Sequence, residues 1–510
     1  MTAAARSRGP IGPSKQASRL ARIFTRIEHK PVYRNSTWGY DVLDQRTGRA
    51  ILGQHQRQMF DPGSTMKLYS VSTGLRLYGS KYRFRTPVYR QGTVANGTLT
   101  GSLVLVGSGD LTFGLRELPG GRLAYENLPA ADHSYADQLP GAVEPHGNPW
   151  LAMRQLAAQV HASGITHING DVVVDNRLFR PFDGFPDGPM SAIWFNENLV
   201  DLLVTPGHRA GAPATIAPRP VTASYTVANR VKTVGPKQAT TLTVTEPTPG
   251  HLRVSGRIAA GGGPVLRVWV VEHPADFART AFIEALRRAG VTVSAPETGA
   301  NPAALLPARG SYRRADRVAI HVSDPMAQYV KLILKVSYNR GADLMVCLAA
   351  VKLGSRNCLS GLRAEVRTAT SVGVPRSGLF PQDGAGSDDQ GRSSPQALAM
   401  FLRGLTHTRY GATLLRGLPI LGRDGTLANV LPKSPAAGHA EVKTGNRVVG
   451  NAAGQIMVLG NSLAGYATTR SGRRVVFMIA VGNVPLSSAL GFLNVVNDQS
   501  RMVAAIQQDL

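Results

Sequence analysis

The sequence predicts a mixed α/β (α+β) fold: one antiparallel sheet, built from both ends of the chain and covered by helices, with a long and mainly β insertion. The chain begins with a helical segment and a hairpin and ends with a hairpin and a helix, so the two ends can share one sheet. Between about residues 91 and 307 the pattern changes to short strands separated by turns. The length of 510 residues exceeds what one hydrophobic core usually supports, and we expect two or three domains.

The N-terminal elements follow from composition and periodicity. Residues 1–15 are small, polar and basic, and we expect them to be disordered. Four apolar residues then recur with helical spacing: Leu20, Ile23, Phe24 and Ile27. A basic amphipathic helix is compatible with a membrane surface, but the stripe is short and a strand follows soon after, so we interpret it as packing on a sheet. Strands at 38–44 and 50–54, joined by a turn, form the first hairpin.

The sheet-and-helix domain is assigned to residues 16–90 and 308–510. Asp61-Pro62-Gly63 breaks the chain, and residues 64–78 form a helix that Gly79 ends. Helical patterns return over 325–353, 395–405 and 409–417. Two strands, at 464–469 and 474–482, and a last helix at 486–508 close the chain.

The inserted region, residues 91–307, is expected to be mainly β. Its strands are expected near 103–106, 171–174, 241–245, 252–254 and 265–271. Two helices interrupt them, near 150–163 and 275–289. Residues 114–149 are rich in Gly and Pro without periodicity, which makes about 114–169 a loop-rich subdomain.

The charge balance indicates anionic partners. Lysine and arginine number 57 against 32 acidic residues, which gives a net charge of +25. Nucleic acid, acidic lipid headgroups and a carboxylate-rich polymer all fit such a charge. A nucleic-acid binder usually clusters its basic residues on a recognisable motif, whereas here they are scattered, so we expect no nucleic-acid partner. Peripheral association with a membrane or with an anionic wall stays open.

Export and redox state are only weakly indicated. The chain has no apolar run of about 18 residues, and residues 1–30 lack the apolar centre of a secretory signal. Two cysteines, Cys347 and Cys358, exclude a cysteine-built metal site and a disulfide-dense scaffold. Two free thiols in a reducing compartment and one bridge in an exported protein both fit this count. Because the pair spans the end of an expected helix, we predict a disulfide.

Three short motifs follow one another along the chain: Ser64-Thr65-Met66-Lys67, Ser337-Tyr338-Asn339 and Lys443-Thr444-Gly445. A serine three residues before a lysine arises about once by chance in a chain of this length. The middle motif has a rival in Ser355-Arg356-Asn357. We prefer Ser337 because apolar helical sequence beside it can bury it, whereas Ser355 follows a glycine in an apparent helix-end loop.

The spacing of the first motif suits nucleophilic catalysis. Residues i and i+3 share one face of a helix, so Lys67 can bring its amine to the hydroxyl of Ser64. A desolvated lysine beside another cation, here Lys443, can lose its proton and act as a general base. A serine at a helix start also aims backbone N–H groups at the reacting carbonyl, where one good donor contributes about 3–4 kcal/mol.

The three motifs in this order resemble the D-alanyl-D-alanine carboxypeptidase/endopeptidase penicillin-binding proteins of class C, a low-molecular-mass type with domains inserted between the first two motifs. The interval of 273 positions between Ser64 and Ser337 fits this type. Further matching blocks are Gly107-Ser108-Gly109-Asp110, Asn196-Glu197-Asn198, Ser255-Gly256-Arg257, Asp383-Gly384-Ala385-Gly386, Leu418-Pro419, Asp424-Gly425-Thr426-Leu427 and Gly465-Tyr466. The resemblance implies a serine transpeptidase/β-lactamase-like catalytic domain.

The resemblance also implies the reaction. Ser64 attacks the penultimate D-alanine carbonyl, Lys67 serves as its general base, and Ser337 relays a proton toward the leaving nitrogen. Water then releases the acyl group, without a metal or an organic cofactor.

Substrate binding falls to the remaining motif residues. Asn339 binds the substrate amide and helps to hold Lys67. Lys443, Thr444 and Gly445 form the motif that meets the terminal carboxylate, and the backbone N–H groups of Ser64 and Asn446 form the oxyanion hole.

Peptidoglycan peptides are the implied substrates, β-lactam antibiotics the implied inhibitors, and an extracytoplasmic location is expected although no signal peptide is visible. The rival interpretations are a β-lactamase or esterase with the same serine, and a non-catalytic cell-wall binding protein. Neither the oligomeric state nor the preference between carboxypeptidase and endopeptidase action is predicted.

Three departures from the family pattern concern the cleft. Gly63 stands where alanine is usual, which we expect to be a small change. Residues 340–343 suggest a few extra residues in one wall, and residues 387–389 replace a leucine-serine pair. Because all three motifs lie outside 91–307, we expect the insertion to handle substrate only. Shortening 114–149 should then spare reaction with a small thioester.

Overall fold

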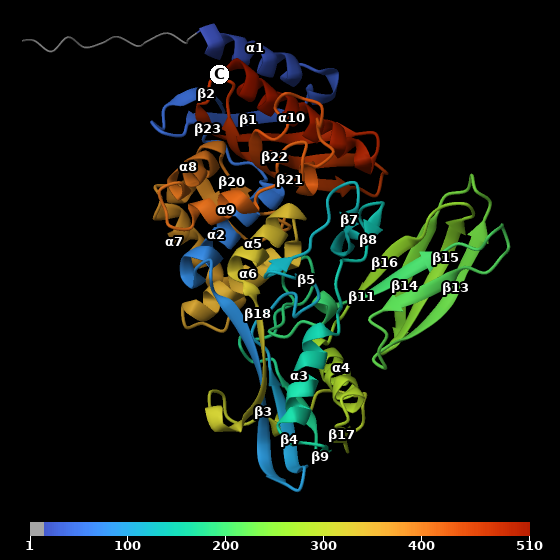
Figure 1. The fold of residues 1–510 in the computed structure, drawn as a ribbon. Helices are drawn as coiled ribbons and strands as arrows, with labels where there is room; N and C mark the ends of the chain where they lie inside the picture. The colour runs from blue at the N-terminus through green and yellow to red at the C-terminus, as the bar shows by residue number, and fades with distance from the viewer. Residues whose placement is uncertain (1–14) are drawn as a thin grey trace, which may run out of the picture.

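One five-stranded antiparallel sheet joins the two ends of the chain, in the order β2-β1-β23-β22-β21 (Figure 1). The computed structural model describes residues 15–510. The strands are β1 (Thr37–Asp44), β2 (Ala50–Gln54), β21 (Ala440–Gly450), β22 (Ile456–Thr468) and β23 (Arg474–Leu486). The prediction of one antiparallel sheet built from both termini is confirmed. The expectation for residues 1–15 lies outside the described residues, apart from Lys15.

Helices cover both faces of this sheet. On one face lie α1 (Lys15–Glu28) and α10 (Phe492–Asp509), which also contact each other, and on the other lies α8 (Pro395–Leu405) (Figure 1). Leu20 and Phe24 of α1 are fully buried, and the Phe24 ring lies 4.8 Å from that of Tyr40 on β1. The apolar stripe of α1 therefore packs on the sheet, as we interpreted it. Within residues 15–510, no helix combines the length and apolarity needed to cross a bilayer.

A helical layer lies between this sheet and the insertion (Figure 1). It consists of α2 (Lys67–Tyr78), α5 (Met326–Lys335), α6 (Asn339–Lys352), α7 (Leu362–Thr370) and α9 (Gly411–Gly417). Helix α2 is buried from Lys67 to Leu75 and packs closely on α6: a Cβ at Gly74 would lie 2.9 Å from the sulfur of Met345. Cys347 of α6 is bonded to Cys358, so the predicted disulfide is present.

The insertion contains a six-stranded sheet of order β17-β9-β4-β3-β18, with β10 paired to β4. Its strands are β3 (Arg83–Ala95), β4 (Thr98–Val106), β9 (His167–Asn169), β10 (Val172–Asp175), β17 (Thr292–Val293) and β18 (Arg317–Pro325), and it is packed against α3 (Leu151–Ala162) and α4 (Pro274–Arg288). The boundaries between the catalytic domain and the insertion, at 90/91 and 307/308, stay a prediction. Strand β3 crosses the first of them, because it runs from Arg83 to Ala95.

Two smaller sheets complete the insertion. One has the order β12-β11-β16, from β11 (Leu199–Thr205), β12 (Thr215–Arg219) and β16 (Val265–Val270). The other has the order β13-β15-β14, from β13 (Thr226–Val234), β14 (Thr241–Thr248) and β15 (His251–Ala259), and projects from the body of the molecule (Figure 1). Residues 114–149 hold only two-residue strands and the 3-10 turn η3 (His133–Tyr135).

Candidate active site

Ser64 and Lys67 meet at the start of α2. Ser64 lies in the 3-10 turn η2 (Gly63–Met66), one turn before the α-helix that the sequence predicted to begin at this serine. The Lys67 amine lies 2.6 Å from Ser64 Oγ, 2.5 Å from Asn339 Oδ1 and 3.1 Å from the carbonyl oxygen of Ala385. Three oxygen acceptors therefore fix the amine against the serine hydroxyl.

Burial controls the protonation of Lys67. The side chain is fully buried, and this desolvation lowers its pKa to about 8, although Asp187, Asp343 and Asp383 pull it upward. A lysine with this pKa is partly neutral near pH 8, so it can accept the proton of the serine that it contacts.

Two buried carboxyl groups support the Lys67 side of the site. Asp343 of α6 accepts the N–H groups of Gly384 and Ala385, and Asp383 accepts those of residues 386–388. Burial raises the pKa of both carboxyl groups. These bonds hold the segment whose Ala385 carbonyl accepts from Lys67.

Residues 340–343 belong to a regular helix and not to an inserted loop, and of these four Arg340 lines the cavity beside Asn339. They form the first turn of α6, which runs without interruption from Asn339 to Lys352. The side chain of Asp343 turns inward to the bonds just described, and Arg340 donates to the carbonyl oxygen of Glu197 at 2.9 Å.

Ser337 lies between α5 and α6 with a φ of 64°, a left-handed conformation that is uncommon for a residue with a Cβ. Its hydroxyl accepts a hydrogen bond from Lys443 Nζ at 2.9 Å. The rival Ser355 lies in the loop after α6, where its hydroxyl donates to Ser360 Oγ. The structure thus brings Ser337, and not Ser355, to the other motif residues.

Lys443, Thr444, Gly445 and Asn446 lie on β21, an edge strand that the sequence did not predict. Lys443 is fully buried, and this burial, aided by the charge of Lys67, holds its pKa well below the usual range. The Thr444 hydroxyl lies 3.2 Å from that of Thr426. The Asn446 side chain is exposed.

The strand approaches the serine turn closely. A Cβ at Gly445 would lie 2.3 Å from the carbonyl oxygen of Pro62 and 2.8 Å from the nitrogen of Thr65, so only glycine fits here. Gly63 has a φ of 47°, and a Cβ on it would lie 2.7 Å from the nitrogen of Asn446. The glycine at position 63 is therefore a larger departure than expected, and it brings the Asn446 nitrogen beside the turn that holds Ser64.

Two residues of the insertion reach the site and were missed from the sequence. The Tyr135 hydroxyl donates to the carbonyl oxygen of Ser337 and lies 3.1 Å from Asn339 Oδ1. The Asn339 amide donates to Asp187 at 2.8 Å. The expectation that the insertion handles substrate only stays a prediction, but Tyr135, which lies inside 114–149, contacts a motif residue directly. Neither residue belongs to a motif, so no local signal marked them.

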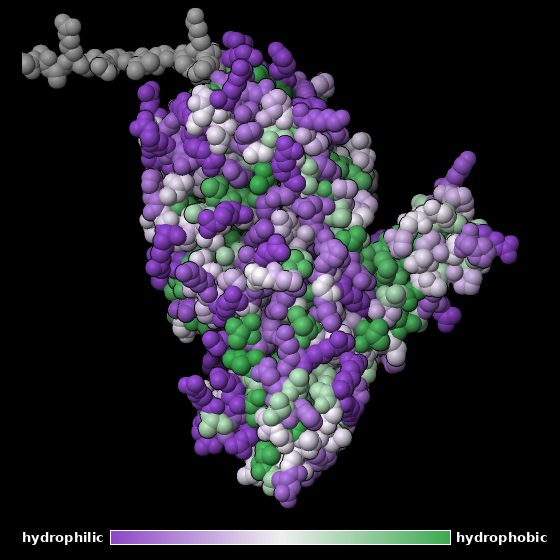
Figure 2. Space-filling model, in the orientation of Figure 1, coloured by the Kyte–Doolittle hydropathy of each residue, from purple (hydrophilic) through white to green (hydrophobic). Residues whose placement is uncertain are grey.

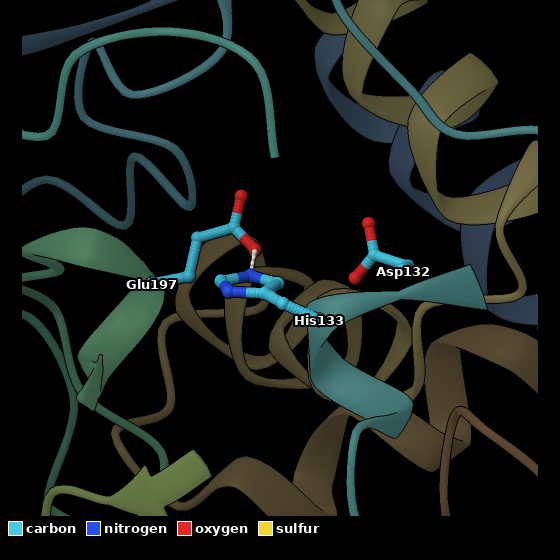
Figure 3. Close-up of side chains that lie close together, drawn as sticks. All are labelled: Asp132, His133 and Glu197. Atoms are coloured by element: carbon cyan, nitrogen blue, oxygen red, sulfur yellow. Dashed lines mark hydrogen bonds and ion pairs between the residues drawn. The ribbon is translucent and has the colours of Figure 1, made fainter. Parts of the chain in front are cut away.

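Tyr135 is anchored by a buried ionic network. His133, in the same turn, bonds to Glu197 through Nε2 at 3.0 Å and to Asp201 through Nδ1 at 2.7 Å, while Asp132 lies alongside (Figure 3). Arg116 pairs with Glu197 at 2.5 Å and with Asp132 at 2.7 Å. Burial alone would lower the pKa of His133, but the neighbouring carboxylates raise it to about 10.

This network does not fit a metal site. Asp132, His133 and Glu197 are close enough to share an ion. Both ring nitrogens of His133 are already bonded, however, and Arg116 supplies a cation to both carboxylates. The group is instead a set of ion pairs between loops of the insertion.

A cavity of about 280 Å³ opens beside Asn339. Its lining joins the catalytic segment to the insertion, through Tyr135, Asp187, Arg340 and the apolar Val268 and Val270 of β16. The cavity carries both charged and apolar groups, which suits a peptide with a polar side chain.

Comparison with known proteins agrees with this geometry. The model of the D-Ala-D-Ala carboxypeptidase 3 (S13) family matches residues 20–499. The chain belongs to this family. A D-alanyl-D-alanine carboxypeptidase of Actinomadura sp. (strain R39) is 25% identical over 444 residues, which cover 82% of this chain and 74% of the relative.

Solved structures of another protein share the fold. The crystal structure of penicillin-binding protein 4 from Haemophilus influenzae superposes with a TM-score of 0.71 at 19% identity and covers 96% of this chain and 99% of its own. The same protein in complex with a β-lactam gives a TM-score of 0.67 at 18% identity, covering 97% of this chain and 100% of its own. The predicted serine transpeptidase/β-lactamase-like fold is confirmed.

Proposed function

We propose that this S13 protein is a serine-type D-alanyl-D-alanine carboxypeptidase and endopeptidase that cleaves peptidoglycan peptides through an acyl-serine intermediate and is acylated by β-lactams. One observation carries the proposal: the Lys67 amine, with its pKa lowered to about 8, lies 2.6 Å from Ser64 Oγ. A serine paired with a lysine that loses its proton near neutral pH is an activated nucleophile.

In the proposed acylation step, Lys67 accepts the proton of Ser64 as Ser64 Oγ attacks the carbonyl of the penultimate D-alanine. The backbone N–H groups of Ser64 and Asn446 stabilise the negative charge on the carbonyl oxygen. A proton passes to the leaving nitrogen through Ser337, whose hydroxyl bonds to Lys443. The C–N bond breaks, and the acyl group remains on Ser64.

Substrate recognition is assigned to Lys443 and Thr444 of β21 and to Asn339 of α6. The terminal carboxylate meets Lys443 and Thr444 of β21, whose amine and hydroxyl donate hydrogen bonds to it. The Asn339 amide meets the substrate backbone. In the second step, water attacks the acyl-serine carbonyl and the proton relay runs in reverse. A peptidoglycan substrate supports a location outside the cytoplasm.

A trapped acyl-enzyme tests this proposal. Benzylpenicillin presents a strained amide beside a carboxylate, and after ring opening its leaving nitrogen stays tethered and hinders water. Intact-protein mass spectrometry should find one stable adduct, and peptide mapping should assign it to Ser64. Ser64→Ala should abolish the adduct, while Ser355→Ala, the matched control in the rival motif, should keep it.

Two outcomes contradict the proposal. Rapid turnover of benzylpenicillin without a trapped adduct indicates a β-lactamase. The absence of any reaction at Ser64 indicates a non-catalytic wall-binding protein.

A further inference from the structure

The projecting sheet β13-β15-β14 has one face on which every charged side chain is basic. The strand registers align Arg230 with Ser255, Lys232 with Arg257, and Ala228 with Arg253. On the other side of β15, Thr245 lies opposite Arg253 and Thr241 opposite Arg257. Side chains two residues apart on a strand share a face, so the four basic residues lie together on one surface.

The opposite face fixes this orientation. Leu252 and Val254 alternate with the basic residues of β15 and are fully buried, and Val231 alternates with Arg230 and Lys232. These apolar side chains belong to a buried cluster that the insertion shares with the helical layer. The sheet cannot turn over without exposing them, so the basic face stays directed to solvent.

The four cations of this face, called here the basic sheet face, are exposed and unpaired. Arg230, Lys232, Arg253 and Arg257 form no ion pair within residues 15–510, whereas many arginines elsewhere pair with carboxylates. Glu246 is the one acidic residue on the three strands, and it accepts the N–H of Gly250. Figure 2 shows hydrophilic side chains at the outer end of this lobe.

The chemistry of the face favours one kind of anion. Threonine hydroxyls of β14 line one edge of the face, at positions 241, 243 and 245. The face carries no aromatic side chain to stack on a base and no large apolar side chain to enter a lipid layer. Exposed cations with hydroxyl groups on a flat surface suit carboxylates carried on a polar polymer.

We propose that the basic sheet face binds the peptide carboxylates of peptidoglycan strands and holds the polymer while a neighbouring peptide is cleaved. The proposal rests on the proposed function, because that function makes peptidoglycan the polymer at hand. Each carboxypeptidase cleavage leaves another free carboxylate on the strand. Many weak contacts on one polymer then raise the local concentration of substrate at the serine.

Cosedimentation with peptidoglycan sacculi tests the face directly. The full-length variant Arg230→Gln/Lys232→Gln/Arg253→Gln/Arg257→Gln is compared with wild type on sacculi from which phosphate-containing polymers have been stripped. A control variant removes the same charge elsewhere: Arg22→Gln/Arg26→Gln/Arg46→Gln/Arg49→Gln, all exposed and outside the insertion. We expect the first variant to bind roughly tenfold more weakly at about 0.1 M salt and with a shallower salt dependence, and the control to bind as wild type does.

The outcomes distinguish the ligands that could bind the basic sheet face. Equal binding by wild type and the sheet variant, or equal loss in the control, overturns the proposal. Binding confined to unstripped sacculi, or to phosphatidylglycerol vesicles, overturns the choice of carboxylates. Thermal unfolding of the fourfold variant, and of the double variant Arg253→Gln/Arg257→Gln, compared with wild type, shows whether any loss reflects misfolding. Acylation of Ser64 by benzylpenicillin, measured on the same samples, should be unchanged and tests the proposed function separately.

Discussion

Removal of the Tyr135 hydroxyl should slow acylation without removing any motif residue. The Tyr135 hydroxyl has one proton, which it donates to the carbonyl oxygen of Ser337, while Asn339 Oδ1 lies 3.1 Å away and also accepts from Lys67. In Tyr135→Phe the Ser337 carbonyl loses this donor, and leaving a buried acceptor without its partner costs about 1–3 kcal/mol. Ser337 needs this support because its left-handed conformation costs energy for a residue other than glycine.

This energy translates into a measurable rate. If the whole loss falls on the position of Ser337 and Asn339 in the transition state, about 1–3 kcal/mol corresponds to acylation roughly 5- to 150-fold slower. The assay is stopped-flow acylation by a chromogenic β-lactam, with the dissociation constant of the first complex separated from the rate of the covalent step. We expect the rate of the covalent step to carry most of the change.

Tyr338→Phe is the matched control. The Tyr338 hydroxyl is fully buried and lacks a hydrogen-bond partner within the described range of the chain, so its removal should cost little. If Tyr135→Phe acylates at the wild-type rate, or if Tyr338→Phe loses as much, the positioning role of Tyr135 is refuted.

Five further outcomes follow from the geometry. The acylation rate should rise with pH and level off above about pH 8, because neutral Lys67 is the base and its pKa is lowered to about 8; a flat profile from about pH 6 to 9.5 contradicts this. Lys67→Ala should slow the formation of the benzylpenicillin adduct by about 10² to 10⁴-fold. Gly445→Ala should slow acylation at least tenfold, by about 1.4 kcal/mol or more, because its Cβ meets backbone atoms of the serine turn, and wild-type kinetics would exclude that contact. Thiol counting on denatured, unreduced protein should find no free thiol, and replacing Cys347 and Cys358 by serine should lower the free energy of unfolding by about 2–4 kcal/mol. Shortening 114–149 should now impair reaction with a small thioester as well as with wall polymer, since this segment holds the tyrosine that contacts Ser337.

The sequence predicted the parts of the fold that local patterns specify. The hairpin of β1 and β2, the helices α3 and α4, and the closing hairpin all have regular periodicity or clear turns. Strand β21 was not predicted because Lys443 and Thr444 are polar and buried. They interrupt the alternation of apolar and polar residues that marks a half-exposed strand. The need to place the Lys443 amine against Ser337 overrides the usual pattern there.

Some residues of the candidate site could be predicted from local patterns and others could not. Ser64, Lys67 and Ser337 carry motif spacing, so they were found before the structure. Tyr135 contacts Ser337 across 202 positions, and no local pattern relates two such residues. Contacts that depend on how the insertion docks on the helices can be found only in three dimensions.

The pairing of the first and last strands also sets the time at which the enzyme can become active during synthesis. Tyr40 of β1 pairs with Ile479 of β23, so β1 has no partner on that side until almost the whole chain has been made. Contacts this distant in sequence form slowly, and the unpaired edge is prone to aggregate while it waits. Lys443 arrives with the same late strands. A chain truncated before β21 therefore holds Ser64 without the Lys443 amine that bonds to Ser337, and we expect it to be inactive.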